Sequence, residues 1–185
     1  RFGGIHRDVL LYSVPKSHIF DFQYRTDFVG SDFSQATLRL DVQLANELKS
    51  KKSGKLKATL VDQEGKPVAE MEKEFRLKGR TDAQVEFALA INRPKLWSAE
   101  TPDLYSLILS LRDENGEERQ AISTKVGFRQ ITIQNKRVYI NGQQVFFKGV
   151  NRHDTHPEFG KTIPIDAMIK DVLMMKQHNI NTLRT

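Results

Sequence analysis

The chain has 185 residues, of which 38% are hydrophobic and 28% are charged, and its formal net charge is +6. This balance supports a packed core and argues against intrinsic disorder. The chain has no cysteine, which excludes disulfides, thiolate catalysis and cysteine-based zinc sites. No apolar run approaches the roughly 20 residues that a membrane-spanning helix needs. We therefore expect a soluble protein with no membrane partner.

Basic residues are spread along the chain except in one dense stretch around Ser53-Gly54. That stretch contains Lys49, Lys51, Lys52, Lys55 and Lys57. A Ser-Gly pair between two alternating segments is typical of a loop. No aromatic residue is interleaved with these lysines, as stacking on single-stranded nucleic acid would require. We interpret the stretch as a solvated loop and expect no nucleic-acid partner.

The first predicted elements are β-strands. Residues 9–14 (VLLYSV) form a short apolar run that predicts a strand ending at Pro15. Residues 19–28 and 36–46 alternate between apolar and polar positions, which is the period of a half-buried strand. Four aromatic residues in alternating segments are expected to lie in the core: Phe20, Phe22, Tyr24 and Phe87.

Further alternating segments follow at spacings typical of a sandwich. They cover residues 55–65, 66–77, 83–91, 104–113 and 118–128, and turn signals lie at Glu64-Gly65 and Asn115-Gly116. About seven short strands predict an antiparallel β-sandwich of immunoglobulin type over residues 15–126. We expect Trp97 to pack at a corner of this sandwich and Tyr105 to form a tyrosine corner.

The pattern changes after Phe128. Asn141-Gly142 predicts a hairpin, and residues 145–150 (VFFKGV) form an apolar run typical of a strand buried on both faces. Residues 165–178 have the spacing of an amphipathic helix, with Asn179 as its C-cap, and residues 181–185 begin another strand. This order predicts one βαβ unit, which cannot bury its own sheet. We therefore expect a piece of a longer protein, less ordered after about residue 150 than in the sandwich.

The residues best suited to catalysis or ligand binding lie in the loop after residues 145–150. This loop holds Arg152, His153, Asp154, His156 and Glu158. In a parallel barrel, functional side chains lie at the C-terminal ends of the strands. His153 and His156 follow one predicted strand and Arg184 ends the next, so we expect all three on one rim.

The same residues also fit purely structural roles. The two histidines can cap backbone groups or lie in solvent, and Arg184 can be a structural ion-pair partner. Metal binding by His153, Asp154, His156 and Glu158 is chemically possible. Their spacing lacks the helical register of a zinc protease, so we predict no metal site in this chain.

Several motifs resemble glycoside hydrolase family 2, and within it the β-galactosidases. GVNRHDTHP (149–157) resembles the first barrel strand and loop of these enzymes, and NTLRT (181–185) resembles the start of a family signature that continues into His-Tyr-Pro. NRPKLWSAETPDLYSL (92–107) and VGFRQI (126–131) are similar to the end of the family's immunoglobulin-like domain and the linker into its barrel. GGIHR with DVLLYSVP resembles the end of its sugar-binding jelly roll.

The resemblance implies three parts and a retaining mechanism. The parts are residues 1–14 as the end of the jelly roll, 15–126 as the immunoglobulin-like sandwich, and 127–185 as the start of a truncated TIM barrel. Retaining enzymes use two carboxylates about 5 Å apart. In this family both are glutamates on later barrel strands, so we predict no catalytic residue here and an inactive chain.

The same resemblance assigns substrate contacts to residues of the loop and of the second barrel strand. They are His156, which matches a histidine that contacts sugar hydroxyls, Arg184, which matches an arginine near the nucleophile, and His153, Asn151 and Asp154. It implies a β-galactoside substrate, a homo-oligomeric parent in the bacterial cytoplasm or periplasm, and Mg and Na as possible cofactors of the parent only. The alternatives are a non-catalytic spacer or carbohydrate-binding sandwich, or a related β-glucuronidase or β-mannosidase.

Overall fold

The computed structural model describes residues 4–5 and 7–185. The chain divides into two compact units, Ser13–Gln144 and Val145–Thr185 together with the described part of Arg1–Tyr12. In the described part of the chain, no helix is long and apolar enough to cross a membrane.

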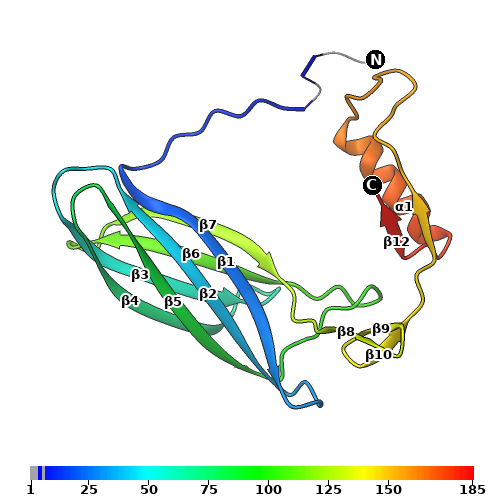
Figure 1. Cartoon of the computed structure of the whole chain (residues 1–185), viewed down its shortest axis with the longest axis horizontal. Coiled ribbons are helices and arrows are strands. Elements are labelled where there is room, and N and C mark those ends of the chain that lie inside the picture. Colours follow the sequence, from blue (N-terminus) through cyan, green and yellow to red (C-terminus); the bar gives the residue numbers. More distant parts are fainter. Residues whose placement is uncertain (1–3, 6) are drawn as a thin grey trace. The chain divides into compact units, whose positions relative to one another are not determined.

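Seven antiparallel strands in two sheets form the β-sandwich of the first unit (Figure 1). One sheet has the order β1-β2-β5 and the other has the order β4-β3-β6-β7. The strands are β1 (Ser17–Val29), β2 (Gln35–Asn46), β3 (Lys52–Val61), β4 (Pro67–Leu77), β5 (Thr81–Asn92), β6 (Tyr105–Asp113) and β7 (Glu118–Val126). The immunoglobulin-like sandwich predicted from the alternation is confirmed.

The core lies between the inner rows of the two sheets. It consists of one row per strand, including Leu38, Leu40, Val42 and Leu44 of β2, Leu56 and Leu60 of β3, Phe87 and Leu89 of β5, and Leu107, Leu109 and Leu111 of β6. The glutamates of β4 face outward, and Glu70 and Glu72 pair with Lys57 and Lys55 of β3 at 2.8 Å each. These pairs explain why a strand with dense charges forms the edge of this sheet.

A β-bulge in β1 changes which aromatic residues reach the core. The register with β2 shifts between Ile19 and Asp21, which leaves Phe20 as the extra residue. Phe20 is 64% exposed and Tyr24 is 41% exposed, whereas Phe87 is buried and Phe22 packs against the core. The prediction that Phe20 and Tyr24 lie in the core is therefore wrong. Phe20 is the extra residue of the bulge, whereas Tyr24 pairs with Leu40 on the inner face and stays partly exposed because β1 is an edge strand.

Ser53 and Gly54 belong to β3, so the loop predicted at this pair is wrong in position. Gly54 pairs with Phe75 on one side and with Asp113 on the other. A β-carbon at residue 54 would overlap the carbonyl oxygen of Arg112. This glycine therefore marks a close approach of two strands instead of a turn.

The strand predicted for residues 9–14 does not form. These residues are an extended segment outside any sheet, and Leu10, Leu11 and Tyr12 are at least 82% exposed. An apolar run becomes a strand only when a second strand supplies hydrogen-bond partners, and the described residues offer none to this segment.

The corner of the sandwich that holds Trp97 and Tyr105 has the predicted structure. The backbone N–H of Lys95 donates to the Tyr105 hydroxyl at 2.8 Å, and the Tyr105 and Phe128 rings meet edge to face with centroids 5.2 Å apart. The guanidinium of Arg129 lies 4.7 Å from the centre of the Trp97 ring. Tyr105 is thus a tyrosine corner and Trp97 is a packing residue.

A small three-stranded sheet follows the sandwich in the chain, in the order β10-β9-β8. Its strands are β8 (Ile131–Gln134), β9 (Arg137–Ile140) and β10 (Gln143–Val145). Asn141 and Gly142 both have positive φ, which confirms the predicted hairpin turn. Asn135 and Lys136 also have positive φ and form a second turn of this kind. The Asn141 side chain donates to the Trp97 carbonyl at 3.0 Å.

The second unit contains the βαβ element expected at the start of a barrel. Strand β11 (Gly149–Asn151) is parallel to β12 (Thr182–Arg184), and helix α1 (Ile165–Gln177) connects them. Asn179 lies just after the cap residue His178, with φ 55°. The N–H groups of Asn179 and Ile180 donate to the carbonyls of Lys176 and Met175, which ends the helix in a Schellman motif.

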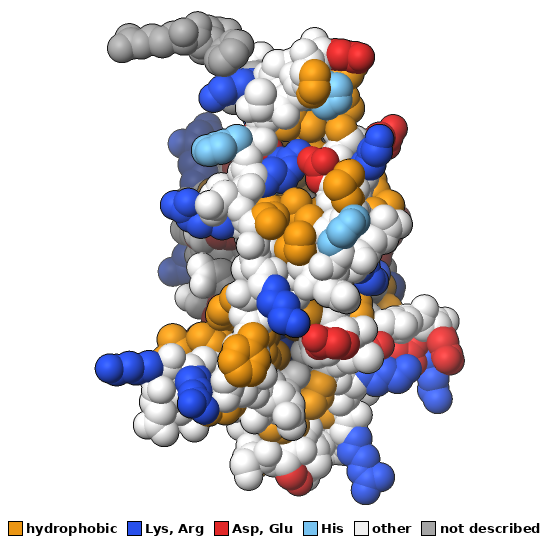
Figure 2. Space-filling view, turned by 90° about the vertical axis from the view of Figure 1, so that its right-hand side faces the viewer, with side chains coloured by type: hydrophobic (Ala, Val, Ile, Leu, Met, Phe, Trp, Pro, Cys, Tyr) orange, Lys and Arg blue, Asp and Glu red, His pale blue; other side chains and the backbone are white. Residues whose placement is uncertain are grey.

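The apolar run at residues 145–150 is less strand-like than predicted. Val145 ends β10 and Gly149 begins β11, whereas Phe146 and Phe147 between these strands are 69% and 59% exposed. Ile165 and Leu173 of α1 are also exposed, and Figure 2 shows hydrophobic side chains on the surface of this unit. A single pair of parallel strands cannot cover both of its faces, which explains the exposure.

We expect the Tyr105→Phe substitution to lower the free energy of unfolding by about 1–3 kcal/mol, because it leaves the Lys95 N–H without its acceptor. The matched control is Tyr24→Phe, which removes a hydroxyl that donates to the Lys125 carbonyl at an exposed edge. We expect this control to change stability by less than about 0.5 kcal/mol. Urea unfolding of both variants measures the difference, and equal losses would contradict the tyrosine-corner interpretation.

Candidate active site

The C-terminal ends of β11 and β12 bring two of the predicted site residues together. The strands pair in register, so that Asn151 lies beside Arg184. The backbone N–H of Arg152 donates to the carbonyl of Arg184 at 2.9 Å, which continues the pairing past the end of β11. Parallel strands place both residues at one edge of the sheet, where barrel enzymes carry their functional groups.

Asn181 fixes the entry into both strands. Its side-chain oxygen accepts from the Lys148 N–H at 2.8 Å, and its side-chain nitrogen donates to the Phe146 carbonyl at 2.9 Å. The Asn181 backbone N–H donates to the Lys148 carbonyl at 3.0 Å. Asn181 is not among the predicted site residues, although it opens the NTLRT motif.

His156 is held in a tight turn that defines its ring chemistry. Its backbone N–H and carbonyl both bond to Gly160, at 2.6 and 2.9 Å. The ring nitrogen Nδ1 accepts from the backbone N–H groups of Glu158 and Phe159, at 3.2 and 3.4 Å. Because Nδ1 accepts, the neutral imidazole carries its proton on Nε2. The Phe159 ring lies 4.9 Å away, and Nε2–H can donate to a ligand hydroxyl.

Arg152 joins the site loop to helix α1. Its side chain is only 12% exposed, and its Nε donates to Asp171 of the helix at 2.8 Å. A second guanidinium nitrogen pairs with Asp154. The hydrogen bond to Asp171, followed by the one to Asp154, raises the pKa of Arg152 above its usual range. Arg152 therefore remains charged, and it restrains the loop through Asp171 of α1 and through Asp154.

Asp154 is engaged by two guanidinium groups. Arg152 and Arg7 both pair with its carboxylate, and Arg7 also donates to the carbonyl of Lys161 at 3.3 Å. The hydrogen bond from Arg152 lowers the pKa of Asp154, and the charge of Arg7 lowers it further. The structure thus gives Asp154 a structural role in the loop, whereas the resemblance assigns it a substrate contact.

His153 lies between these anchored residues and is exposed. Its carbonyl accepts from the Thr155 N–H at 2.8 Å. In the described part of the chain, no three His, Asp or Glu side chains are grouped so that they could hold a metal ion. The loop therefore presents imidazole, amide and guanidinium groups, which suit hydrogen bonds to hydroxyl groups.

Two family models match the chain along most of its length. Glycosyl hydrolases family 2 matches residues 17–129, and the TIM barrel domain of glycosyl hydrolases family 2 matches residues 131–185. The chain therefore belongs to glycosyl hydrolases family 2. Its sandwich is the immunoglobulin-like domain of this family, and its βαβ unit is the beginning of the TIM barrel.

Within the family, the chain is similar in sequence to β-galactosidases and shares its fold with a β-glucuronidase. The chain is 38% identical over 185 residues to a β-galactosidase of Halalkalibacterium halodurans, covering 100% of the chain and 18% of that protein. It is 34% identical over 194 residues to a β-galactosidase of Kluyveromyces lactis, covering 98% of the chain and 19% of that protein. A crystal structure of a Bacteroides uniformis β-glucuronidase shares the fold, with a TM-score of 0.85 and 22% identity over 93% of this chain and 22% of that one. The chain thus spans about a fifth of the length of its curated relatives.

The ion pairs of Asp154 predict a loop that loosens in acid. A carboxylate whose pKa is lowered in the folded state adds stability above its unfolded pKa of about 3.9, and loses this contribution as pH falls through the folded value. We expect the amide-exchange protection factors of residues 152–162 to fall below about pH 4. Asp154→Asn should show fast exchange already at neutral pH, and Asp166→Asn is the matched control outside the network. Unchanged protection in Asp154→Asn would contradict this role.

Proposed function

We propose that the chain is part of a retaining β-galactosidase that hydrolyses terminal non-reducing β-D-galactose residues. The observation that carries this proposal is the 38% identity to a β-galactosidase along the whole chain. The fold alone is shared with a β-glucuronidase, so it does not favour either sugar. The β-glucuronidase and β-mannosidase activities are the alternatives within the family.

In this proposal the chain supplies substrate contacts and no catalytic carboxylate. The Nε2–H of His156 donates to a hydroxyl of the bound galactose, and the turn closed by Gly160 fixes its direction. Asn151 and Arg184 add hydrogen bonds from the ends of β11 and β12. Such fixed donors favour the transition state when they fit its hydroxyl positions better than those of the ground state.

The bond-breaking step requires two carboxylates on later barrel strands of the longer protein. One protonates the glycosidic oxygen while the other attacks the anomeric carbon, and water then releases the sugar from the covalent intermediate. We infer that the parent is a homo-oligomer and that Mg²⁺ and Na⁺ are its possible cofactors. The residues described in this chain do not group into a metal site, so we assign them no step through a metal.

We expect the 185-residue chain alone not to hydrolyse nitrophenyl β-galactoside, because neither catalytic glutamate is present. Turnover that persists through repurification would contradict this. The coding sequence past Thr185 should continue into His-Tyr-Pro and should later supply both glutamates. A stop codon or an unrelated domain there would favour the alternative of a spacer or carbohydrate-binding sandwich.

The longer protein allows a direct test of His156. We expect His156→Ala to lower kcat/KM for nitrophenyl β-galactoside by roughly 100-fold, since it removes a fixed hydrogen-bond donor. His178→Ala is the matched control, because this exposed histidine lies at the end of α1 and its Nδ1 contacts the Met174 carbonyl. Parallel assays with glucuronide and mannoside substrates identify the sugar. Equal losses in both variants would remove His156 from the site.

A further inference from the structure

At one end of the sandwich, the loops β2–β3 and β4–β5 are joined by hydrogen bonds. The side-chain nitrogen of Asn46, which is 2% exposed, donates to the carbonyls of Ser50 and Lys78 at 2.9 Å each. Its side-chain oxygen accepts from the Leu48 N–H at 3.2 Å, and the Arg80 N–H donates to the Leu48 carbonyl at 2.8 Å. A buried amide thus fixes the two loops against each other.

The backbone of the β4–β5 loop is also constrained. A β-carbon at Gly79 would overlap the carbonyl oxygen of Lys49, so the two loops are in direct contact. Arg80 has φ 56°, a left-handed conformation that glycine or asparagine adopts more easily.

These contacts gather cations that are far apart in the sequence. The basic end, as we name it, consists of Lys16, Lys49, Lys51, Lys52, Lys78 and Arg80, all of them exposed. Lys16 joins the group because the Glu47 N–H donates to its carbonyl at 2.8 Å. None of the six forms an ion pair with another described residue. The acidic residues nearby are Glu47 and Asp82 on the same segments and Glu114 of the β6–β7 turn, which contacts Ser53. Cations therefore outnumber carboxylates at this end of the sandwich.

A pocket of about 200 Å³ lies beside the basic end. Leu48, Phe75 and Leu111 give it an apolar wall, and Lys16, Lys52 and Arg112 supply charge. Arg119, which also lines it, is neutralised by Asp113 and Glu117 at 2.6 Å each. The pocket thus combines an apolar surface with cations that have no described ion-pair partner.

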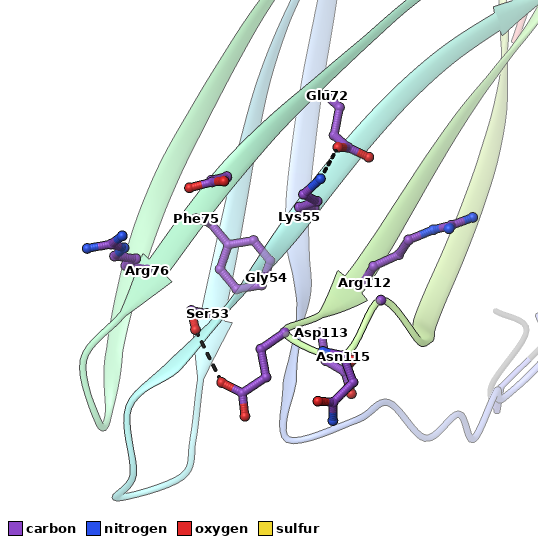
Figure 3. Close-up of a pocket in the computed structure, with 12 residues that line it drawn as sticks. Ser53, Gly54, Lys55, Glu72, Phe75, Arg76, Arg112, Asp113 and Asn115 are labelled. Carbon is purple, nitrogen blue, oxygen red and sulfur yellow. Dashed lines mark hydrogen bonds and ion pairs between the residues drawn. The ribbon is translucent and has the colours of Figure 1, made fainter.

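A larger hollow of about 520 Å³ adjoins this pocket and shares Ser53, Phe75, Arg112 and Asp113 with it. Figure 3 shows this hollow, in which Lys55 is paired with Glu72 and Arg76 and Arg112 point away from each other. Its acidic residues are Glu72, Glu74, Asp113 and Glu114, and they outnumber its basic ones. The larger hollow is therefore unfavourable for an anion, and the smaller pocket is the anion-binding site.

We propose that the basic end and its pocket bind a uronic-acid polysaccharide. The lysines are flexible point charges that suit carboxylates repeated along a polymer, and the Arg112 guanidinium matches a carboxylate in shape. The C–H face of one sugar ring fits against the partly exposed Leu48, an apolar contact that the phosphate backbone of a nucleic-acid duplex cannot provide. The only aromatic residue that lines the pocket, Phe75, is 6% exposed, so the pocket offers no ring on which the bases of a single strand could stack. This binding is separate from the proposed catalytic function, since no residue of the barrel unit takes part.

The test is calorimetric titration of the whole 185-residue chain with polygalacturonate oligomers at about 50 and about 200 mM salt, where screening separates charge-driven binding from other contacts. We expect saturable binding that weakens at the higher salt concentration. The combined variant Lys49→Glu, Lys51→Glu, Lys78→Glu should bind at least roughly tenfold more weakly. Arg112→Gln, which removes the guanidinium of the pocket and leaves the six cations of the basic end in place, should also weaken binding.

The matched control is Lys66→Glu, Lys95→Glu, Lys136→Glu, which changes the net charge equally at exposed positions outside the basic end. We expect its affinity to stay within about twofold of the original, since a distant charge is screened. Thermal unfolding of each variant confirms that it is folded. The proposal is overturned if no binding occurs at the lower salt, if both combined variants lose affinity equally, or if uncharged dextran or a DNA duplex binds as tightly.

Discussion

The burial of the leucine rows between the two sheets is the constraint on which the remaining structure depends. Leu38, Leu40 and Leu44 of β2 face Leu56 and Leu60 of β3 across a core that is almost free of solvent. Each fully buried leucine contributes roughly 1.5–3 kcal/mol relative to an exposed one. Because β2, β3 and β6 lie inside their sheets, this burial fixes both ends of the sandwich. The Tyr105 corner and the paired loops around Asn46 are built on these fixed ends.

The strands of the sandwich could be predicted because they show an apolar period of two with turn residues between them. The exceptions arise where a feature depends on a neighbouring strand. The bulge at Phe20 exists only in the register with β2, and the role of Gly54 depends on the backbone of β6. Neither relation leaves a signal in local periodicity. The apolar runs at 9–14 and 145–150 are similarly exposed, because no neighbouring strand or helix among the described residues covers them.

For the candidate site, the sequence identified the loop but not what holds it. His153, Asp154 and His156 were found from their position after a barrel-type strand. Their partners come from distant segments: Arg7 precedes the sandwich, and Asp171 lies on α1. Only the fold brings these charges together. It also shows that Arg152, which could have been a ligand-binding group, is largely buried and occupied by two carboxylates. The ring state of His156 likewise depends on a turn geometry that no spacing rule predicts.

The bulge in β1 and the charges of β4 have a further consequence at the edges of the two sheets. An unprotected edge strand can pair with the edge of another molecule and start aggregation. In β1, the extra residue at Phe20 interrupts the ladder. In β4, Pro67 lacks a backbone donor, and the outward Glu70 and Glu72 are paired with Lys57 and Lys55 of β3. A second molecule that approached β1 would meet a mismatched register, and one that approached β4 would meet a missing donor beside charged side chains. These two edges are therefore poor templates for strand addition, and β5 and β7 form the other edges of the two sheets.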